Sequence, residues 1–313
     1  MLRRSSDDVE QMKALVTGAG GFVGRHLVQH LRTCGDDVSA ATRDTAPDLL
    51  EPDAWRRHLA KVQPEVVFHL AGQASVSDSW IDPLGTFRAN AEGTLHLLEA
   101  CRANGISRVL CVSTADVYGI VEARHLPLCE TAPARPVTPY ASSKLAAEAL
   151  ALQAALGHGQ EVLIARPFLH MGPGQDNRFV GAALASRIAL AEADDRASAE
   201  VAVGNLSPRR DITDVRDVVA AYRLLMAHGV PGLIYNVCSG RAVSIRELAE
   251  RLLARAVRPL TLRDDPTLMR PVDIPLLQGD PTRLKAATGW EPVIALGDTI
   301  DAVLAEARSR VSR

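Results

Sequence analysis

The sequence lacks an excess of charge of either sign, since its 313 residues give a formal net charge of -2. A chain without a basic surplus has no field to attract nucleic acid, so we expect a small-molecule partner and no nucleic acid. It also lacks any run near the ~18 consecutive apolar residues that a membrane span needs. Its first residues, MLRRSSDDVEQ, have no apolar stretch typical of a signal peptide. We therefore expect no membrane association and a cytoplasmic location.

Clustered cysteines are missing as well. The five cysteines form neither a Cys-x-x-Cys pair nor a Cys/His cluster at metal-ligand spacing, so we expect no metal site. Cys111 and Cys238 lie inside apolar runs. We expect them to be buried thiols of a protein in a reducing compartment.

What the sequence does contain, from Lys13 onward, is an alternation of short apolar runs and longer amphipathic stretches. This alternation predicts an α/β fold in which a doubly wound parallel sheet is covered by helices on both faces. The apolar runs predict strands at 14–16, 38–41, 66–70, 109–112 and 162–165. The amphipathic stretches predict helices at 21–31, 86–103 and 140–156.

A glycine-rich turn joins the first strand to the first helix in the segment ALVTGAGGFVGRHLVQHL, residues 14–31. Here Gly18 suits a tight turn, Gly21 lets backbone approach a pyrophosphate, and Gly24 permits close packing of helix on sheet. Free N–H groups at the helix N-terminus then attract the anion. The segment predicts a Rossmann-type dinucleotide site, and the alternative is that the glycines serve only a tight turn.

The choice between the two nicotinamide dinucleotides depends on the end of the second strand. An acid there usually holds the ribose 2′-hydroxyl of NAD, whereas this chain has Thr42 and Arg43. A hydroxyl and a guanidinium suit a 2′-phosphate, which favours NADP(H). Asp44 is next along the chain and keeps NAD(H) open, and Arg43 could instead be a solvated surface residue.

After Pro167 the regular alternation ends in the loop segment MGPGQDNR, residues 171–178. We expect residues 1–11 to form a flexible tail and 12–167 the Rossmann dinucleotide-binding domain. Residues 168–313 are expected to form mainly a smaller C-terminal α/β lobe that binds the substrate. An apolar run near 233–238 is expected to rejoin the main sheet as a further strand.

Tyr140 and Lys144 are four residues apart at the start of a helical pattern, PYASSKLAAEAL, so they lie on one helix face. A tyrosine with an ordinary pKa of about 10 needs a nearby ammonium to act as an acid or base at neutral pH. Alone, such a pair is also common on protein surfaces.

Thr114 follows the fourth strand, at the edge of the sheet where ligands of open parallel sheets collect. Its hydroxyl can donate to a carbonyl while Tyr140 protonates the developing alkoxide. The alternative role of Thr114 is to cap the strand end.

These parts, in this order, resemble the extended short-chain dehydrogenases/reductases, the NAD-dependent epimerase/dehydratase family of nucleotide-sugar enzymes. The match covers nearly all of residues 12–292. The resemblance implies that Thr114, Tyr140 and Lys144 form a catalytic triad, and that Tyr140 and Lys144 also contact the nicotinamide cofactor. Beside the glycines, the further cofactor contacts that it implies are Phe22, Val23, Asp48, Leu49, Leu70, Ala71 and Gly72.

Within this family, four separated segments resemble the reductases of GDP-bound 4-keto-6-deoxy sugars. They are RPFLHMGPGQDNRFV, VGNLSPRRDITDVRDVV, YNVCSGRAVSIREL and RPVDIPLLQGDPTRLKAATGWEP. The resemblance implies NADPH-dependent reduction of the C4 ketone of GDP-4-keto-6-deoxy-D-mannose to GDP-D-rhamnose (GDP-6-deoxy-D-mannose). The substrate contacts that it implies are Ser75, Asp116, His170, Phe179, Val180, Asn205, Arg210, Arg270 and Asp273.

Residue chemistry supports part of this set, because arginine suits bidentate binding of a diphosphate and a carboxylate accepts two ribose hydroxyls. Purely structural roles for these residues also stay open. Arg209 and Arg210 could pair with Asp211 or Asp214 on the surface, and Asp273 could cap a turn.

Three positions depart from the reductase pattern. Leu169 and Met171 stand where asparagine and threonine are customary, and Ile212 stands where an aromatic residue is usual. A lost polar contact in a substrate pocket shifts selectivity, so these departures leave the exact sugar open.

Other functions also stay open. A GDP-mannose 4,6-dehydratase needs an acid–base pair after the catalytic threonine, where this chain has Ala115 and Asp116, so Asp116 would act alone or serve a turn. A C4 epimerase keeps its NAD bound, which the missing acid at Thr42 disfavours; another NDP-sugar reductase is a further alternative. The alternative of a different class is a non-catalytic dinucleotide-binding scaffold.

Members of this family are usually dimers that assemble through a four-helix bundle. The apolar stripes of the helices expected at 86–103 and 140–156 fit such a homodimer, and they fit packing on the sheet almost as well.

Overall fold

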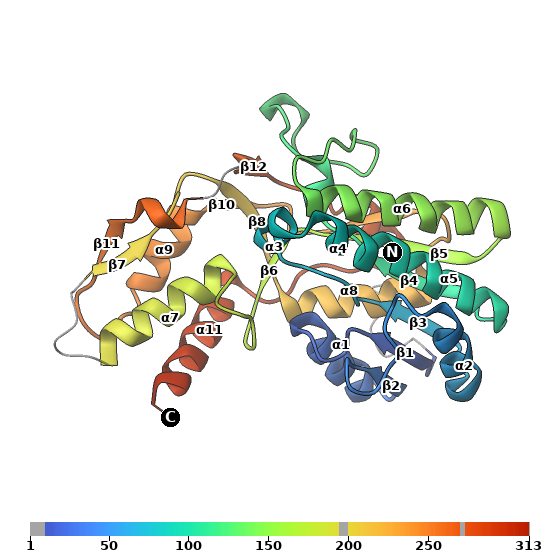
Figure 1. The fold of residues 1–313 in the computed structure, drawn as a ribbon. Coiled ribbons are helices and arrows are strands. Elements are labelled where there is room, and N and C mark those ends of the chain that lie inside the picture. The colour runs from blue at the N-terminus through green and yellow to red at the C-terminus, as the bar shows by residue number, and fades with distance from the viewer. Residues whose placement is uncertain (1–9, 194–199, 270–272, 313) are drawn as a thin grey trace.

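The computed structural model describes residues 10–193, 200–269 and 273–312. Most of the predicted N-terminal tail and the predicted substrate contact Arg270 lie outside these residues. The described chain forms a large lobe around a parallel sheet and a small lobe that holds the C-terminal helix (Figure 1). Within these ranges, no helix is long and apolar enough to cross a membrane.

Six parallel strands form the sheet of the large lobe, in the order β2-β1-β3-β4-β5-β9. All five strands expected from the apolar runs are present, so the α/β class with a parallel sheet is confirmed. The strand expected near 233–238 is β9, which pairs with β5 at the edge of the sheet. The bounds are β1 (Lys13–Thr17), β2 (Asp37–Ala41), β3 (Val66–His69), β4 (Arg108–Val112), β5 (Glu161–Pro167) and β9 (Ile234–Val237).

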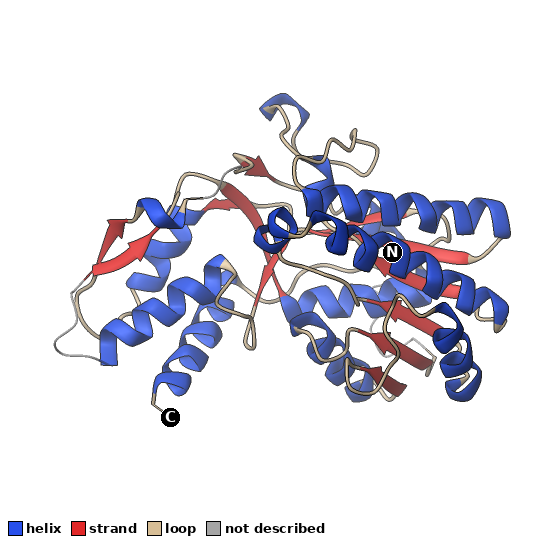
Figure 2. Ribbon diagram, in the orientation of Figure 1, coloured by secondary structure: helices blue, strands red, loops and turns tan. Residues whose placement is uncertain are grey.

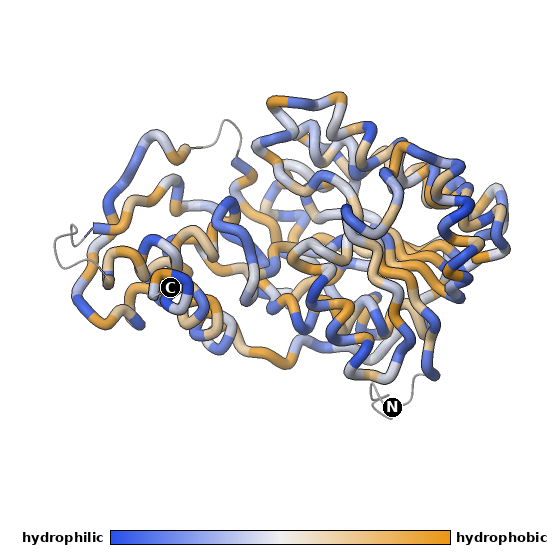
Figure 3. The backbone as a smooth tube through the Cα atoms, turned by 60° about the horizontal axis from the view of Figure 1, so that its bottom comes forward, coloured by the Kyte–Doolittle hydropathy of each residue, from blue (hydrophilic) through white to orange (hydrophobic). Residues whose placement is uncertain are grey.

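Successive residues of these strands point to opposite faces of the sheet, and each face has its own apolar core. Leu15 and Val67 pack on one face, whereas Val16 and Phe68 pack on the other. These strands form the orange layer of Figure 3. The first face is covered by α2 (Pro52–Val62), α5 (Gly93–Ala103) and α6 (Pro139–His158), and the second by α1 (Phe22–Thr33), α8 (Val215–His228) and α10 (Thr282–Thr288).

The helix expected at 86–103 differs from the prediction. It begins earlier, as α4 (Pro83–Phe87), because the Asp82 carboxylate accepts from Gly85 N at 2.8 Å and proline suits the first helical turn. A π-helical segment, η2 (Arg88–Glu92), then leads into α5. Single π turns are frequently found at functional sites, and η2 contains Asn90, which is described below.

The small lobe has an apolar core of its own, built mainly from α7 (Val180–Ala193), α9 (Ile245–Leu253) and α11 (Leu296–Val311) (Figure 2). Its central strand β8 (Arg209–Asp214) pairs with β6 (Leu169–Met171), β10 (Ala242–Ser244) and β12 (Leu276–Leu277), while β7 (Glu200–Val203) pairs with β11 (Thr261–Asp264). Because α8, β9 and α10 pack in the large lobe, residues beyond 167 contribute to both lobes. The remaining short helices are α3 (Val76–Ile81), η3 (Ala115–Tyr118), η4 (Ala123–His125) and η5 (Pro266–Leu268).

Candidate active site

The glycine loop between β1 and α1 has little space for side chains. Gly18 has φ +69°, and a Cβ there would lie 2.8 Å from the backbone nitrogen of Ala71. A Cβ on Gly24 would lie 2.1 Å from the Gly18 carbonyl oxygen, whereas Gly21 leaves 3.2 Å to the same atom. Gly21 directly precedes α1. The first N–H groups of α1 therefore lie next to a loop without bulky side chains, where an anion can approach them. This cradle fits the diphosphate of a dinucleotide.

The loop after β2 is held by contacts that the sequence did not reveal. The backbone carbonyl of Asp48 accepts a hydrogen bond from Trp55 Nε1 at 3.0 Å, and that of Leu49 lies 3.0 Å from Nδ1 of His96. A Cβ on Gly93 would lie 2.8 Å from the Leu49 side chain, so α5 packs closely under this loop. Arg43 is exposed in the same loop, available to an anion at the end of β2.

Thr114 and Tyr140 come together at the carboxyl end of β4. A hydrogen bond joins their side chains, and both residues are buried. Thr114 also fills its alternative capping role, because its Oγ1 accepts from Asp116 N at 3.2 Å at the start of η3. Lys144, one helical turn after Tyr140, donates from Nζ to the Val112 carbonyl at 2.9 Å.

Burial has the largest effect on the pKa values of Tyr140 and Lys144. It raises the pKa of Tyr140, with a further increase from the Asp116 carboxylate and an opposing effect of the hydrogen bond with Thr114. Burial lowers the pKa of Lys144 to about 8, although the nearby Cys111 and Glu148 oppose that change. At neutral pH the structure therefore holds a neutral phenol beside an ammonium.

Asn90 is a site residue that the sequence analysis missed. Its Nδ2 donates to Ser143 Oγ at 2.9 Å, and its Oδ1 accepts from Gln73 N at 2.8 Å. Gly72, with φ +150°, leaves no room for a Cβ, which would lie 2.4 Å from Asn90 Oδ1 and 3.9 Å from Lys144 Nζ. The π turn thus places an amide between the loop after β3 and helix α6.

A second chain of buried polar groups supports the glycine loop. His69 lies between two hydroxyls, with Nδ1 2.9 Å from Thr17 Oγ1 and Nε2 3.0 Å from Thr94 Oγ1. The Thr17 hydroxyl in turn accepts from the backbone nitrogens of Leu70 and Ala71, both at 3.2 Å. Burial lowers the pKa of His69 to about 3, with a smaller effect of Lys144 in the same direction, so the imidazole is neutral.

Three predicted substrate contacts meet in the small lobe. Asp273 accepts from Arg210 Nη2 through Oδ1 and from Asn205 Nδ2 through Oδ2, both at 3.1 Å. Arg210 therefore pairs with Asp273 rather than with the neighbouring Asp211, whose carboxylate accepts from the Ser239 and Gly240 backbone. A guanidinium, an amide and a carboxylate are grouped where diphosphate and ribose chemistry is expected.

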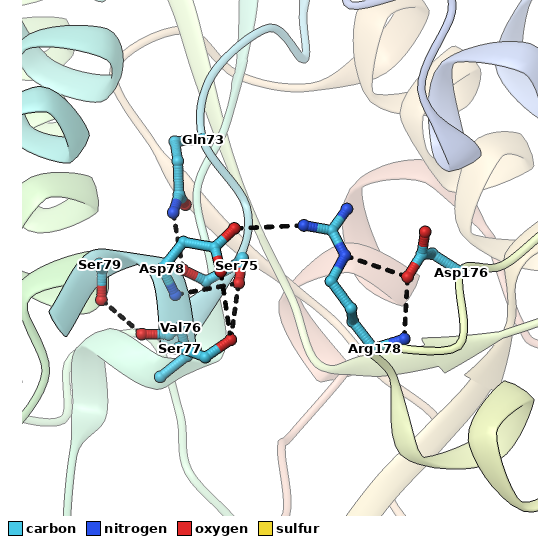
Figure 4. Close-up of polar contacts among 8 residues, drawn as sticks. All are labelled: Gln73, Ser75, Val76, Ser77, Asp78, Ser79, Asp176 and Arg178. Atoms are coloured by element: carbon cyan, nitrogen blue, oxygen red, sulfur yellow. Dashed lines mark hydrogen bonds and ion pairs between the residues drawn. The ribbon is translucent and has the colours of Figure 1, made fainter. Parts of the chain in front are cut away.

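The loop of residues 172–178, called here the inter-lobe loop, links the two lobes. Arg25 of α1 donates to the carbonyls of Gly20 and Gly174, and His26 Nε2 lies 2.7 Å from the Pro173 carbonyl. At the other end, Arg178 Nη1 donates to Asp78 Oδ2 of α3 at 3.2 Å while its Nε donates to Asp176 at 3.0 Å (Figure 4).

The remaining predicted contacts lie around this loop. The ring of His170 stacks on that of Phe22, with centroids 6.1 Å apart. Ser75 caps α3 by accepting from Asp78 N at 3.2 Å, as Figure 4 shows. Phe179 immediately follows the inter-lobe loop, and Val180 begins α7 and packs on the small-lobe core.

The three departures from the reductase pattern lie together. Leu169 of β6 and Ile212 of β8 are direct register partners. Met171 contacts Gly181, where a Cβ would lie 2.8 Å from the Met171 methyl group. All three side chains pack in or against the small-lobe core. Apolar packing therefore stands where the reductase pattern has polar or aromatic side chains.

The fold and the site define a class of protein: a dinucleotide-dependent enzyme of the short-chain dehydrogenase/reductase type, with a threonine after strand β4 and a tyrosine and a lysine on the adjacent helix α6. Residues 14–238 match the model of the NAD dependent epimerase/dehydratase family, and the chain belongs to that family.

Individual relatives narrow the class. The chain is 42% identical over 300 residues to GDP-6-deoxy-D-mannose reductase of Pseudomonas aeruginosa, across 96% of this chain and 98% of that protein. The structure of RMD from Pseudomonas aeruginosa complexed with NADPH matches with a TM-score of 0.88 and 40% identity, over 96% of this chain and all of that one. UDP-glucose 4-epimerase of Thermus thermophilus in complex with NAD matches with a TM-score of 0.84 and 30% identity, over 95% of this chain and 99% of that one.

Proposed function

We propose that this protein reduces the C4 ketone of GDP-4-keto-6-deoxy-D-mannose with NADPH and forms GDP-D-rhamnose. The observation that carries the proposal is the 42% identity, over nearly the full length of both chains, to a GDP-6-deoxy-D-mannose reductase. The related RMD structure contains NADPH, which agrees with the cofactor expected from Arg43.

The residues present fit a nicotinamide dinucleotide. The bare backbone at Gly18, Gly21 and Gly24 would receive the diphosphate, and Arg43 would pair with a 2′-phosphate. When bound, NADPH supplies the hydride for the carbonyl carbon. Gly72 and Lys144 lie close together at the inner end of this cradle, where Lys144 would hold a ribose hydroxyl.

The protein's own part in the reduction is to place and protonate the ketone oxygen. Thr114 donates a hydrogen bond to that oxygen and so favours negative charge on it. Tyr140 then gives up its proton to the alkoxide, and the Lys144 ammonium stabilises the phenolate that remains. Water or a neighbouring acid restores the Tyr140 proton after each turnover.

The other end of the substrate is assigned to the small lobe. Arg210 would bind the diphosphate, Asp273 the ribose and Asn205 the base, with Phe179 and Val180 alongside. The Arg210–Asp273 pair is mostly buried before substrate arrives, which keeps both side chains in fixed directions. Pre-ordered groups lower the entropy cost of binding.

The decisive experiment supplies the purified protein with NADPH and GDP-4-keto-6-deoxy-D-mannose, follows reduced-nicotinamide absorbance, and identifies the sugar by NMR. We expect NADPH consumption with formation of GDP-D-rhamnose. Absence of NADPH consumption, together with conversion of GDP-mannose supplied in a parallel reaction, would overturn the reductase proposal in favour of a dehydratase. Formation of the C4 epimer of GDP-D-rhamnose would agree with ketone reduction by NADPH but would contradict the proposed stereochemistry of the product.

We also propose that the enzyme is a homodimer in the cytoplasm, assembled through α4–η2–α5 and α6. Two large side chains on α4, Leu84 and Phe87, are 69% and 47% exposed, and α4 packs beside α6. None of the five cysteines forms a disulfide bond, which fits a reducing compartment. Light scattering should give twice the chain mass, and Phe87→Glu should give the monomer mass; a monomeric wild type would refute the assembly.

A further inference from the structure

A buried ion pair lies behind the catalytic residues, and the mechanism above does not use it. The side chains of Glu148 and Arg166 are only 3% and 5% exposed. Arg166 donates through Nε to one carboxylate oxygen at 2.8 Å and through Nη2 to the other at 2.7 Å. Its guanidinium also lies 4.8 Å from the ring centroid of Tyr118. Because burial of two charges costs desolvation energy, such a pair is weak evidence for stability and calls for another explanation.

The geometry connects Glu148 to the end of β4. Glu148 lies on α6 one helical turn after Lys144. Its Oε1 accepts a hydrogen bond from the Ser113 hydroxyl at 2.5 Å, while Lys144 Nζ donates to the Val112 carbonyl at 2.9 Å. Since Val112 and Ser113 directly precede Thr114, two side chains of α6, Lys144 and Glu148, hold the strand end that presents Thr114.

The second connection is electrostatic. The ionisable groups that face Lys144 from the packed elements are His69 of β3, Cys111 of β4, and Tyr140 and Glu148 of its own helix. Burial lowers the pKa of His69 to about 3 and raises that of the Cys111 thiol to about 12, so both are neutral near pH 7. Burial likewise keeps Tyr140 neutral. Among these neighbours, Glu148 is the one that supplies negative charge.

We propose that Glu148, oriented by Arg166, is a positioning residue for the reduction: it fixes the Thr114 end of β4 to α6 and supplies the charge that favours the ammonium form of Lys144. The kinetic part of this inference rests on the proposed function. The electrostatic part concerns the protein alone.

The test variant is Glu148→Gln, which keeps the size of the side chain and removes its charge. We expect kcat to fall about tenfold or more, because a displaced Thr114 weakens alignment, while KM for the GDP-sugar changes little. We also expect a lower pKa for Lys144, since removal of a nearby negative charge disfavours the ammonium. The alkaline limb of the pH–rate profile then moves to lower pH.

The Lys144 pKa is measured directly, without cofactor or substrate, by NMR titration of protein labelled with ¹³C at lysine. The chain has only four lysines, Lys13, Lys61, Lys144 and Lys285, so the Lys144→Arg spectrum assigns the signal. If wild type reduces no ketosugar, the proposed function fails, yet the two titrations still test Glu148. An unchanged Lys144 pKa in Glu148→Gln would overturn the electrostatic role.

The matched control is Asp36→Asn. Asp36 and Arg223 form a similar pair, with bonds of 2.8 and 3.2 Å and side chains 0% and 2% exposed, between the α1–β2 turn and α8. This variant should lose stability as Glu148→Gln does, with kcat and the Lys144 titration as in wild type.

A double variant, Glu148→Leu with Arg166→Met, separates structure from positioning. Apolar replacement of a buried ion pair often restores stability. We expect its unfolding midpoint to return toward wild type while kcat stays low. Recovery of kcat together with stability would show that the pair is only structural.

Discussion

Tyr140 is held in the protonated form that ketone reduction requires. Burial raises its pKa, and the Asp116 carboxylate raises it further, so the phenol carries a proton throughout the neutral range. A phenol this reluctant to ionise is a poor base for the reverse oxidation. A raised pKa also makes the phenol a weaker acid, so in the proposed reduction Tyr140 depends on the Lys144 ammonium to stabilise the phenolate formed in turnover.

Removal of the Tyr140 hydroxyl should thus stop proton donation without harming the fold. We expect Tyr140→Phe to lower kcat about 10²- to 10⁴-fold, the usual contribution of a general acid, with NADPH binding nearly unchanged by fluorescence titration. Tyr222→Phe is the control, because Tyr222 is fully buried and its hydroxyl has no hydrogen-bond partner within the described structure. Equal rates for Tyr140→Phe and wild type would remove Tyr140 from the mechanism.

Lys144 sets the expected pH dependence. Burial lowers its pKa to about 8, so the ammonium is present below that pH and lost above it. Since Tyr140 stays protonated over this range, log kcat/KM should be level near pH 7 and fall with unit slope above about 8. Stopped-flow rates across the range check this, and a profile that rises through pH 8 would contradict the role given to the ammonium.

At the scale of residues, the sequence predicts Thr114, Tyr140 and Lys144 because local spacing and strand ends define them. It does not predict Asn90, which acts through Gln73 and Ser143, residues far from it in the chain. Glu148 and Arg166 are missed for the same reason, since a pair 18 positions apart has no local pattern. The fold alone brings such groups together.

At the scale of elements, the β1–α1 turn is the most local and the most predictable part of the molecule. Gly24 allows no side chain, because a Cβ would overlap the Gly18 carbonyl, whereas a Cβ on Gly20 would meet only the Thr42 side chain at 3.7 Å. The two positions therefore differ in packing although they share one loop.

This contrast predicts different outcomes for two small substitutions. Gly24→Ala should cost roughly 1–3 kcal/mol in denaturant unfolding, as overpacking does, and weaken NADPH binding by displacing the loop. Gly20→Ala should be tolerated in both measurements. Equal unfolding free energies and equal NADPH affinities for the two variants would contradict this difference in packing.

Tertiary contacts override local pattern in two other elements. The periodicity of residues 86–103 indicates one regular helix, yet the Asn90 contacts are accommodated by the π turn of η2. The small-lobe sheet is not predictable from local pattern either, because β8 pairs with three strands of two or three residues from distant segments. Short strands have no measurable periodicity.

The inter-lobe loop ends in an exposed ion pair, with Arg178 59% and Asp78 49% exposed. Pairs this exposed contribute ~0.2–1 kcal/mol, so Asp78→Ala should raise KM for the GDP-sugar by about two- to fivefold and leave kcat near wild type. Asp78→Arg should raise KM further through repulsion. Asp53→Ala, which breaks an exposed pair with Arg56 on α2, is the control; an equal KM effect there would argue against a role for the loop.

At the scale of the whole molecule, the lobes are tied together by more than this surface contact. Asp217 of α8 accepts from the backbone nitrogens of Val293 and Ile294, which lead into α11. Thr299 of α11 donates to Asp214, at the end of β8, at 2.7 Å. The small-lobe core is thus anchored through buried and partly buried hydrogen bonds to helix α8, which packs in the large-lobe core.

These ties predict one cooperative unfolding transition. All three tryptophans, Trp55, Trp80 and Trp290, lie in or on the large lobe, so their fluorescence reports on that lobe, whereas far-ultraviolet circular dichroism reports on helices of both. The two denaturation curves should coincide. NADPH at about 100 times its dissociation constant should shift both curves together by about 2.7 kcal/mol. Ligand binding stabilises only the unit that binds the ligand. If NADPH shifted the fluorescence transition but left part of the dichroism transition at its original denaturant concentration, the lobes would unfold separately.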